Sequence, residues 1–92
     1  MYSMNDPYLD SLKYLVLIKG NTLLSVSHEA KQLSELITRQ TNHQIAEVTI
    51  LRLYGFMTQK FPPSAFTKNT LAQFCGFENY VAFCEEQESR LE

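Results

Sequence analysis

Residues 33–56 read LSELITRQTNHQIAEVTILRLYGF, and this stretch decides the fold of the chain. Its apolar side chains recur at spacings of three and four, which is the period of an amphipathic helix. The polar residues 42–44 interrupt the pattern, and it resumes from about residue 47. The stretch therefore predicts two helices joined by a short polar turn.

The first helix of this pair is predicted over residues 28–41 and the second over residues 47–57. Ser27 is expected to cap the first helix, because a serine oxygen can accept from the free N–H groups of a first turn. The inward positions expected from the spacing are Ala30, Leu33, Leu36, Ile37 and Gln40 in the first helix, and Ile50, Leu53, Tyr54 and Met57 in the second. Together the two helices form a helix-turn-helix candidate at residues 28–57.

A further helix is predicted before the pair, over residues 7–19. Asp6 can accept from its first N–H groups, and Pro7 at the first helical position loses no hydrogen bond. The apolar run 14–18 alone could form a buried strand, but the cap favours a helix. Gly20 is expected to end this helix, because glycine adopts the left-handed backbone that closes many helices.

Two short helices are predicted after the pair. A loop is expected at 58–66, because its two consecutive prolines break any helix. Thr67 is then expected to cap a helix over 68–75, which Gly76 closes with an apolar contact from Phe77.

The last helix is predicted over 79–87, with Tyr80, Phe83 and Cys84 facing inward and the polar residues 88–92 fraying. The chain has 92 residues, 45% of them hydrophobic, with only three glycines and three prolines. This size and composition predict one globular domain over 1–92. The expected fold is all-α, a compact bundle of about five short helices that includes the helix-turn-helix candidate.

The net charge of −2 does not by itself suggest a nucleic-acid binder, but the charges are unevenly placed. Residues 11–68 carry seven basic and three acidic side chains, whereas residues 69–92 carry one basic and five acidic side chains. The centre of the chain is mildly basic and its tail is acidic. Such an asymmetry is compatible with a basic face and also with ordinary solvated surface.

No arrangement of reactive side chains predicts catalysis. Cys75 and Cys84 lie in apolar helical patterns without basic neighbours that would activate a thiol. Together with His28 and His43 they do not supply the ligand spacing of a metal site. No glycine-rich phosphate loop is present. We therefore expect neither enzymatic activity, nor a cofactor, nor a small-molecule substrate.

The longest apolar run, residues 14–18, is far shorter than the ~20 residues that cross a bilayer. The first residues lack the basic and apolar regions of a signal peptide. Two cysteines do not make a disulfide framework. Cytoplasm is the expected location, and no membrane partner is expected.

The helix-turn-helix candidate leads to the first functional hypothesis, which is binding of double-stranded DNA. The second helix of such a unit reads the major groove when its outer face carries polar and basic side chains. Here that face is expected to present Thr49 and Arg52 to the bases. The basic residues expected at flanking phosphates are Lys31, Arg39, Lys60 and Lys68.

A family resemblance points the same way. Residues 49–55, TILRLYG, and 70–77, TLAQFCGF, followed by Tyr80 and Phe83, resemble a domain at the start of many uncharacterised Bacteroidota proteins. The resemblance covers about residues 27–84. That domain is in turn similar to the five-helix lambda-repressor/Xre class, in which the second and third helices read DNA. The resemblance implies the DNA-binding domain of a small bacterial transcriptional regulator and adds no catalytic residue.

The alternative hypothesis is a protein-interaction or dimerisation module that acts without nucleic acid. The second helix of the pair carries more apolar residues than one core-facing side needs, namely Val48, Leu51 and Phe56. Exposed together, these three side chains would form a patch for a protein partner or a second copy.

Overall fold

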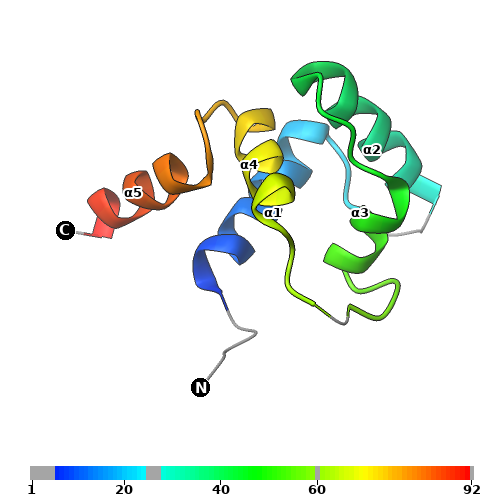
Figure 1. Cartoon of the computed structure of the whole chain (residues 1–92), viewed down its shortest axis with the longest axis horizontal. Coiled ribbons are helices and arrows are strands. Elements are labelled where there is room, and N and C mark those ends of the chain that lie inside the picture. The colour runs from blue at the N-terminus through cyan, green and yellow to red at the C-terminus, as the bar shows by residue number, and fades with distance from the viewer. Residues whose placement is uncertain (1–5, 25–27, 60, 92) are drawn as a thin grey trace.

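The computed structural model describes residues 6–24, 28–59 and 61–91 of the chain, and Ser27 lies outside these ranges. Within them the chain forms five α-helices and no strand (Figure 1). The helices are α1 (Pro7–Gly20), α2 (His28–Thr41), α3 (Glu47–Leu53), α4 (Ala65–Phe74) and α5 (Tyr80–Leu91). The all-helical class predicted from the sequence is confirmed.

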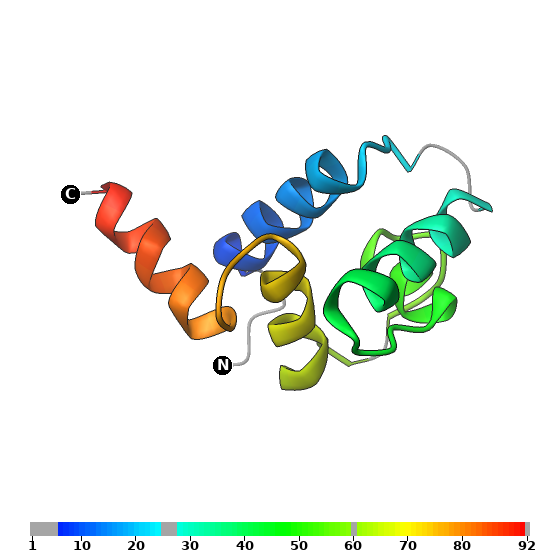
Figure 2. The same cartoon turned by 90° about the horizontal axis from the view of Figure 1, so that it is seen from above.

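Helix α4 is central to the packing, because it contacts α1, α2 and α5. Helix α3 packs against α2, and α5 also touches α1. In both Figure 1 and Figure 2, α5 lies at one end of the molecule and the α2–α3 pair lies at the other. The radius of gyration is 12.8 Å, which is that of a compact domain of this length.

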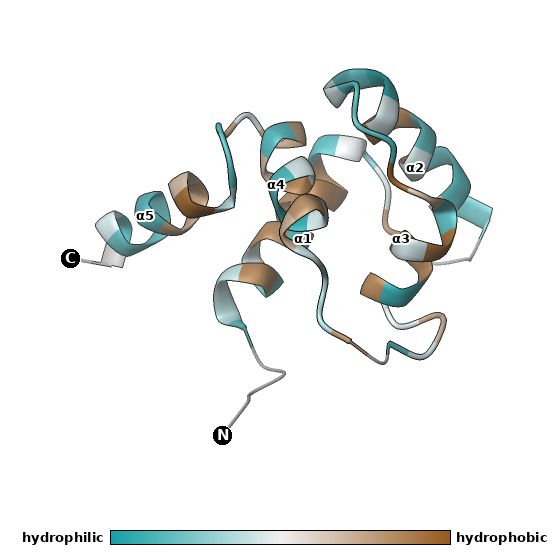
Figure 3. Ribbon diagram, in the orientation of Figure 1, coloured by the Kyte–Doolittle hydropathy of each residue, from teal (hydrophilic) through white to brown (hydrophobic). Residues whose placement is uncertain are grey.

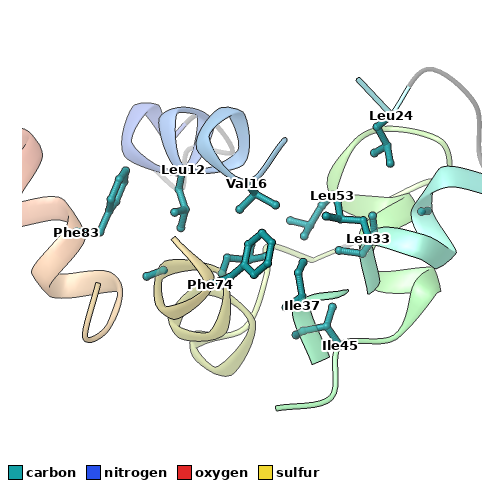
Figure 4. Packing of buried hydrophobic residues seen from close by; sticks show 13 residues of the cluster. Leu12, Val16, Leu24, Leu33, Ile37, Ile45, Leu53, Phe74 and Phe83 are labelled. Carbon is teal, nitrogen blue, oxygen red and sulfur yellow. The ribbon is translucent and has the colours of Figure 1, made fainter. Parts of the chain in front are cut away.

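The core joins side chains from all five helices. Figure 4 shows Phe74 of α4 between Val16 of α1 and Ile37 of α2. All three side chains are almost completely buried. Figure 3 shows the apolar residues of α1 and α4 gathered at the centre, with polar residues along α2 and the far half of α5. The helical periodicity of the sequence therefore places one contiguous core between the two ends.

Helix α1 begins as predicted, because one oxygen of Asp6 accepts from the N–H groups of Tyr8 and Leu9 at 3.1 and 3.2 Å. Its predicted end was wrong by one residue, since Gly20 is still helical and Asn21 takes the left-handed cap with φ of 55°. Gly20 instead allows α1 to lie close to α2, because it has no side chain. A Cβ at Gly20 would lie 2.7 Å from Cδ1 of Leu33 in α2.

Helix α3 is shorter than predicted and ends at Leu53 rather than at Met57. Gly55 has φ of +86°, which reverses the chain, and the N–H of Phe56 then donates to the carbonyl of Leu51 at 2.8 Å. The inward position predicted for Met57 was wrong for this reason. Its side chain lies beyond the helix and is 41% exposed.

Helix α4 begins at Ala65, three residues earlier than the start predicted from a cap at Thr67. Ser64 is the observed cap, because its Oγ accepts from the N–H of Thr67 at 3.2 Å. Gly76 ends the helix as predicted, with φ of +95° and the N–H of Phe77 donating to the carbonyl of Ala72 at 2.9 Å.

Helix α5 is capped by Asn79, whose Oδ1 accepts from the N–H of Ala82 at 2.8 Å. It continues through Leu91, so the described part of the tail that we expected to fray is helical. An ion pair between Glu86 and Arg90, with 3.1 Å between Nε and Oε1, spans its last turns.

Helices α1 and α5 are also joined by a hydrogen bond. The hydroxyl of Tyr80 donates to the second carboxylate oxygen of Asp6 at 2.9 Å. The backbone N–H of Tyr80 donates to Oδ1 of Asn69 at 2.9 Å, which holds the start of α5 against α4. Asp6 therefore caps one helix and anchors another.

None of the described helices has the length and the apolar composition that a membrane span requires.

Candidate functional site

The connection between α2 and α3 is fixed by two side chains of α2, the buried Ser34 and the half-buried Thr38. The hydroxyl of Ser34 donates to the carbonyl of Ile45, and the N–H of Ile45 donates to Oγ1 of Thr38 at 3.2 Å. Both backbone groups of Ile45 are thereby satisfied by side chains, and its own side chain is buried in the core. The turn has no regular structure, yet the buried backbone groups of Ile45 have the hydrogen-bond partners that a helix would give them.

The turn starts with a left-handed residue, Asn42, with φ of 59°. Thr41 supports it, because its hydroxyl donates to the carbonyl of Ile37 at 2.8 Å and accepts from the N–H of His43 at 3.2 Å. These bonds set the angle at which α3 leaves α2.

The spacing of apolar residues predicted Ala30, Leu33 and Ile37 on the inner side of α2 correctly. It placed Gln40 there in error, because Gln40 is exposed.

Replacement of Ser34 by alanine should lower the free energy of unfolding by about 1–2 kcal/mol, because it leaves the buried carbonyl of Ile45 without its donor. Urea denaturation followed by circular dichroism measures this change. The matched control is Ser89→Ala on the exposed side of α5, which should stay within about 0.5 kcal/mol of the native protein. Equal stabilities of the two variants would contradict the role given to Ser34.

The far end of α3 is fixed to α1. The hydroxyl of Tyr54 donates to the carbonyl of Lys13 at 2.7 Å, and the Nζ of Lys13 lies 5.3 Å from the centre of the Tyr54 ring. Burial raises the pKa of Tyr54 well above its ordinary value, so this hydroxyl stays protonated and keeps donating. With its entry held by α2 and its exit held by α1, α3 has one orientation.

The outer side of α3 presents Arg52. Ile50 and Leu53 face inward and are buried, whereas Arg52 is exposed and Thr49 is half-buried. No carboxylate of the described residues lies within ion-pair distance of Arg52, because the one ion pair among them joins Glu86 and Arg90. The guanidinium is therefore free to bind an external acceptor.

A groove of about 750 Å³ runs between this side of α3 and the loop that leads to α4. Thr49 and Arg52 form part of one wall, and Phe56 and Phe61 form part of its apolar lining. Arg52 is the one charged side chain among the described residues that line it. Phe61 is 77% exposed. Among the described residues, the groove thus combines one positive charge with exposed apolar side chains.

The other predicted DNA contacts are distributed unevenly. Lys31 and Arg39 are exposed on α2, Lys31 near the start of the helix and Arg39 in its last turn, which precedes the connection to α3. Lys68 lies on the α5 side of the molecule, where its Nζ is 4.9 Å from the centre of the Tyr80 ring, and it does not join the groove. Lys60 lies outside the described residues. Four of the six predicted residues, Thr49, Arg52, Lys31 and Arg39, thus lie on the α2–α3 unit.

Acidic residues offset the basic ones on this unit. Helices α2 and α3 together carry three basic side chains and three acidic ones. Their combined charge is therefore zero. A polyanion would be held here by individual contacts of exposed cations rather than by a strong local field.

The patch predicted for the alternative hypothesis does not form as expected. Val48 and Leu51 are half-buried, and Leu51 packs against the core. Phe56 is 41% exposed and faces the groove. Sequence reasoning missed Phe61 as its neighbour, because a loop residue has no periodicity from which its exposure could be inferred.

The two cysteine thiols have pKa values above the ordinary value. Burial raises the pKa of Cys75 to about 11, an effect that the nearby Lys19 partly offsets. Burial also raises the pKa of Cys84. Both thiols therefore stay protonated. No cluster of three or more histidine, cysteine or acidic side chains that could hold a metal ion occurs in the described ranges.

Comparisons of this chain with protein-family models, with curated proteins and with solved structures find no match.

Proposed function

We propose that this chain is a DNA-binding domain of a small bacterial transcriptional regulator, with α2, the turn and α3 as its helix-turn-helix. The observation that carries the proposal is the exposed guanidinium of Arg52, which has no acidic partner among the described residues and stands on a helix fixed at both ends. The resemblance of the sequence to the lambda-repressor/Xre class supports the same function.

In this proposal α3 lies in the major groove of the duplex. Arg52 donates to the O6 and N7 acceptors of a guanine, and the hydroxyl of Thr49 contacts a neighbouring base or phosphate. Lys31 and Arg39 bind flanking phosphates, and the sequence adds Lys60 as a further candidate. Lys68 is expected to contribute less to DNA binding, because its Nζ lies over the Tyr80 ring, away from α3.

Fluorescence anisotropy of a labelled random duplex tests the proposal. With two to three phosphates neutralised, the affinity should fall about 10- to 40-fold between about 50 and about 200 mM salt. Arg52→Ala should weaken binding about 5- to 150-fold, because one bidentate contact to a base contributes about 1–3 kcal/mol.

The matched control is Arg90→Ala, which removes the same charge from the exposed α5 at the opposite end of the molecule. It should leave the affinity unchanged. Equal effects of the two substitutions would mean that only net charge matters, and an absence of binding at about 50 mM salt would refute DNA binding.

A second candidate function, protein interaction, is favoured by the groove beside α3. Its lining of Phe56, Met57 and Phe61 suits an apolar segment, and Arg52 suits an acidic group on the same segment. The salt-dependent loss of duplex affinity predicted above separates the two candidates.

A further inference from the structure

The groove beside α3 has the size and the lining of a small-molecule site. Its volume of about 750 Å³ falls within the ~300–1,000 Å³ range of ligand pockets, which are mostly apolar and carry a few polar groups. Three of its large apolar side chains are exposed, Phe61 at 77% and Phe56 and Met57 at 41% each. A molecule that covers them would remove apolar surface from water, which favours binding.

Parts of both walls of the groove are fixed in place. One wall is α3, and the residue that follows this helix, Tyr54, donates its hydroxyl proton to the carbonyl of Lys13. The other wall is the loop that leads to α4, where Pro62 and Pro63 line the groove. Each proline ring fixes one backbone angle of this loop. A site with fixed walls loses little conformational freedom on binding, which favours affinity for a ligand.

The polar groups of the groove select an anion with one charge. Arg52 is the one charged side chain among the described lining residues, and no described carboxylate pairs with it. The hydroxyl of Ser64 is already engaged, because it donates to Oγ1 of Thr67 and accepts from the N–H of the same residue, both at 3.2 Å. A planar guanidinium matches a carboxylate through two parallel hydrogen bonds. The groove therefore suits a monocarboxylate with an apolar body.

We propose that the groove binds an apolar monocarboxylate as a regulatory ligand that releases the chain from DNA. The inference rests on the proposed function, because Thr49 and Arg52 line the groove and are also the proposed base contacts. N–H groups of the guanidinium that donate to a carboxylate are not available to a guanine. The ligand and the duplex therefore compete for one side chain, and each lowers the affinity of the chain for the other.

An NMR titration of the isotope-labelled chain with 4-phenylbutyrate tests the site. The resonances of the residues that line the groove should shift, with a dissociation constant of about 0.1–2 mM, the affinity expected of a ligand of about a dozen heavy atoms. The neutral 4-phenylbutan-1-ol has the same apolar body. It should bind at least about fivefold more weakly, because it cannot form the charge-assisted hydrogen bonds with Arg52.

Two variants test the two ends of the ligand separately. Arg52→Ala should raise the dissociation constant of 4-phenylbutyrate at least about fivefold, and Phe61→Ala should raise it about 3- to 10-fold. The matched controls are Arg90→Ala, which removes the same charge from α5, and Leu23→Ala, which removes a similarly exposed apolar side chain outside the groove. Neither control should change the dissociation constant.

Fluorescence anisotropy of the labelled duplex in the presence of 4-phenylbutyrate tests the regulation. At about ten times its own dissociation constant, the ligand should weaken duplex binding about tenfold. Sodium acetate at the same concentration has no apolar body and serves as the control for ionic strength, so it should have only the small effect of added salt. In Phe61→Ala, about 3- to 10-fold more ligand should be needed for the same relative release.

Groove resonances that do not shift at about 10 mM 4-phenylbutyrate would overturn the inference. So would equal binding of the acid and the alcohol, or ligand binding that leaves the duplex affinity unchanged. Groove resonances that shift with protein concentration alone would show a second copy in the groove and would also overturn it. Duplex binding without ligand binding would refute the inference alone. Ligand binding at Arg52 by a chain that binds no duplex would refute the proposed function and leave the site standing.

Discussion

Phe83→Ala should lower the free energy of unfolding by about 3–5 kcal/mol, the range found when a buried aromatic ring is removed. Phe83 is fully buried, and no other described side chain of α5 is buried. Its ring packs edge-to-face on Phe77 at 5.1 Å between centres. A domain of this length has a total stability of about 5–14 kcal/mol, so the loss is a large share of it.

Urea denaturation followed by circular dichroism measures the effect of Phe83→Ala. The matched control is Val81→Ala on the same helix, where the side chain is 63% exposed. That variant should stay within about 0.5 kcal/mol of the native protein. A loss below about 1 kcal/mol in Phe83→Ala would show that α5 is not held by this ring.

High pH should destabilise the domain, in part through Tyr54. Burial raises the pKa of Tyr54 in the folded state above the ordinary value of about 10 in the unfolded chain. The folded state therefore holds the proton more tightly. The resulting stabilisation is complete below pH about 10 and is lost above it, at up to about 1.4 kcal/mol per pH unit. Cys75, with a pKa raised to about 11, adds a similar loss that begins near pH 9.

Urea titrations between pH about 8 and about 12 measure this dependence. Tyr54→Phe should be less stable at neutral pH by about 1 kcal/mol, because the bond to the Lys13 carbonyl is lost, but its stability should fall less steeply above pH 10. Tyr14→Phe is the matched control, since Tyr14 is exposed. It should keep the native slope, and an unchanged slope in Tyr54→Phe would contradict the assignment.

The parts of the fold that depend on neighbouring residues could be predicted from the sequence. Asp6 and Pro7 start α1, and the limits of α2 were predicted to the residue. Gly76 ends α4 as predicted, and the N–H of Phe77 donates to the carbonyl of Ala72. In each case a side chain or a backbone angle acts within four residues of its own position, so the sequence contains the whole cause.

The parts that depend on distant contacts could not be predicted. One error was local, because apolar spacing continued α3 to Met57 although the left-handed Gly55 turns the chain away two residues earlier. The other errors came from distant contacts. Tyr54 is held by a carbonyl 41 residues earlier. Ser34, a polar residue in the predicted pattern, is buried because its hydroxyl reaches Ile45. Such bonds are visible only after the helices have been assembled.

The candidate site could likewise be predicted only in part. The exposure of Arg52 follows from its place opposite Ile50 and Leu53 on one short helix. The groove beside it does not, because it depends on the path of a loop without periodicity. The position of Lys68 depends on which helix packs beside α4, and this is decided by tertiary contacts.

The carboxylate of Asp6 has a consequence for how the protein is made. One oxygen serves the first helix and the other binds Tyr80, 74 positions later. On the ribosome the earlier residues emerge first, and α5 is the last of the five described helices to leave the exit tunnel. The first helix must therefore wait, with its capping residue only partly engaged and the site of Phe83 unfilled, until α5 has been synthesised.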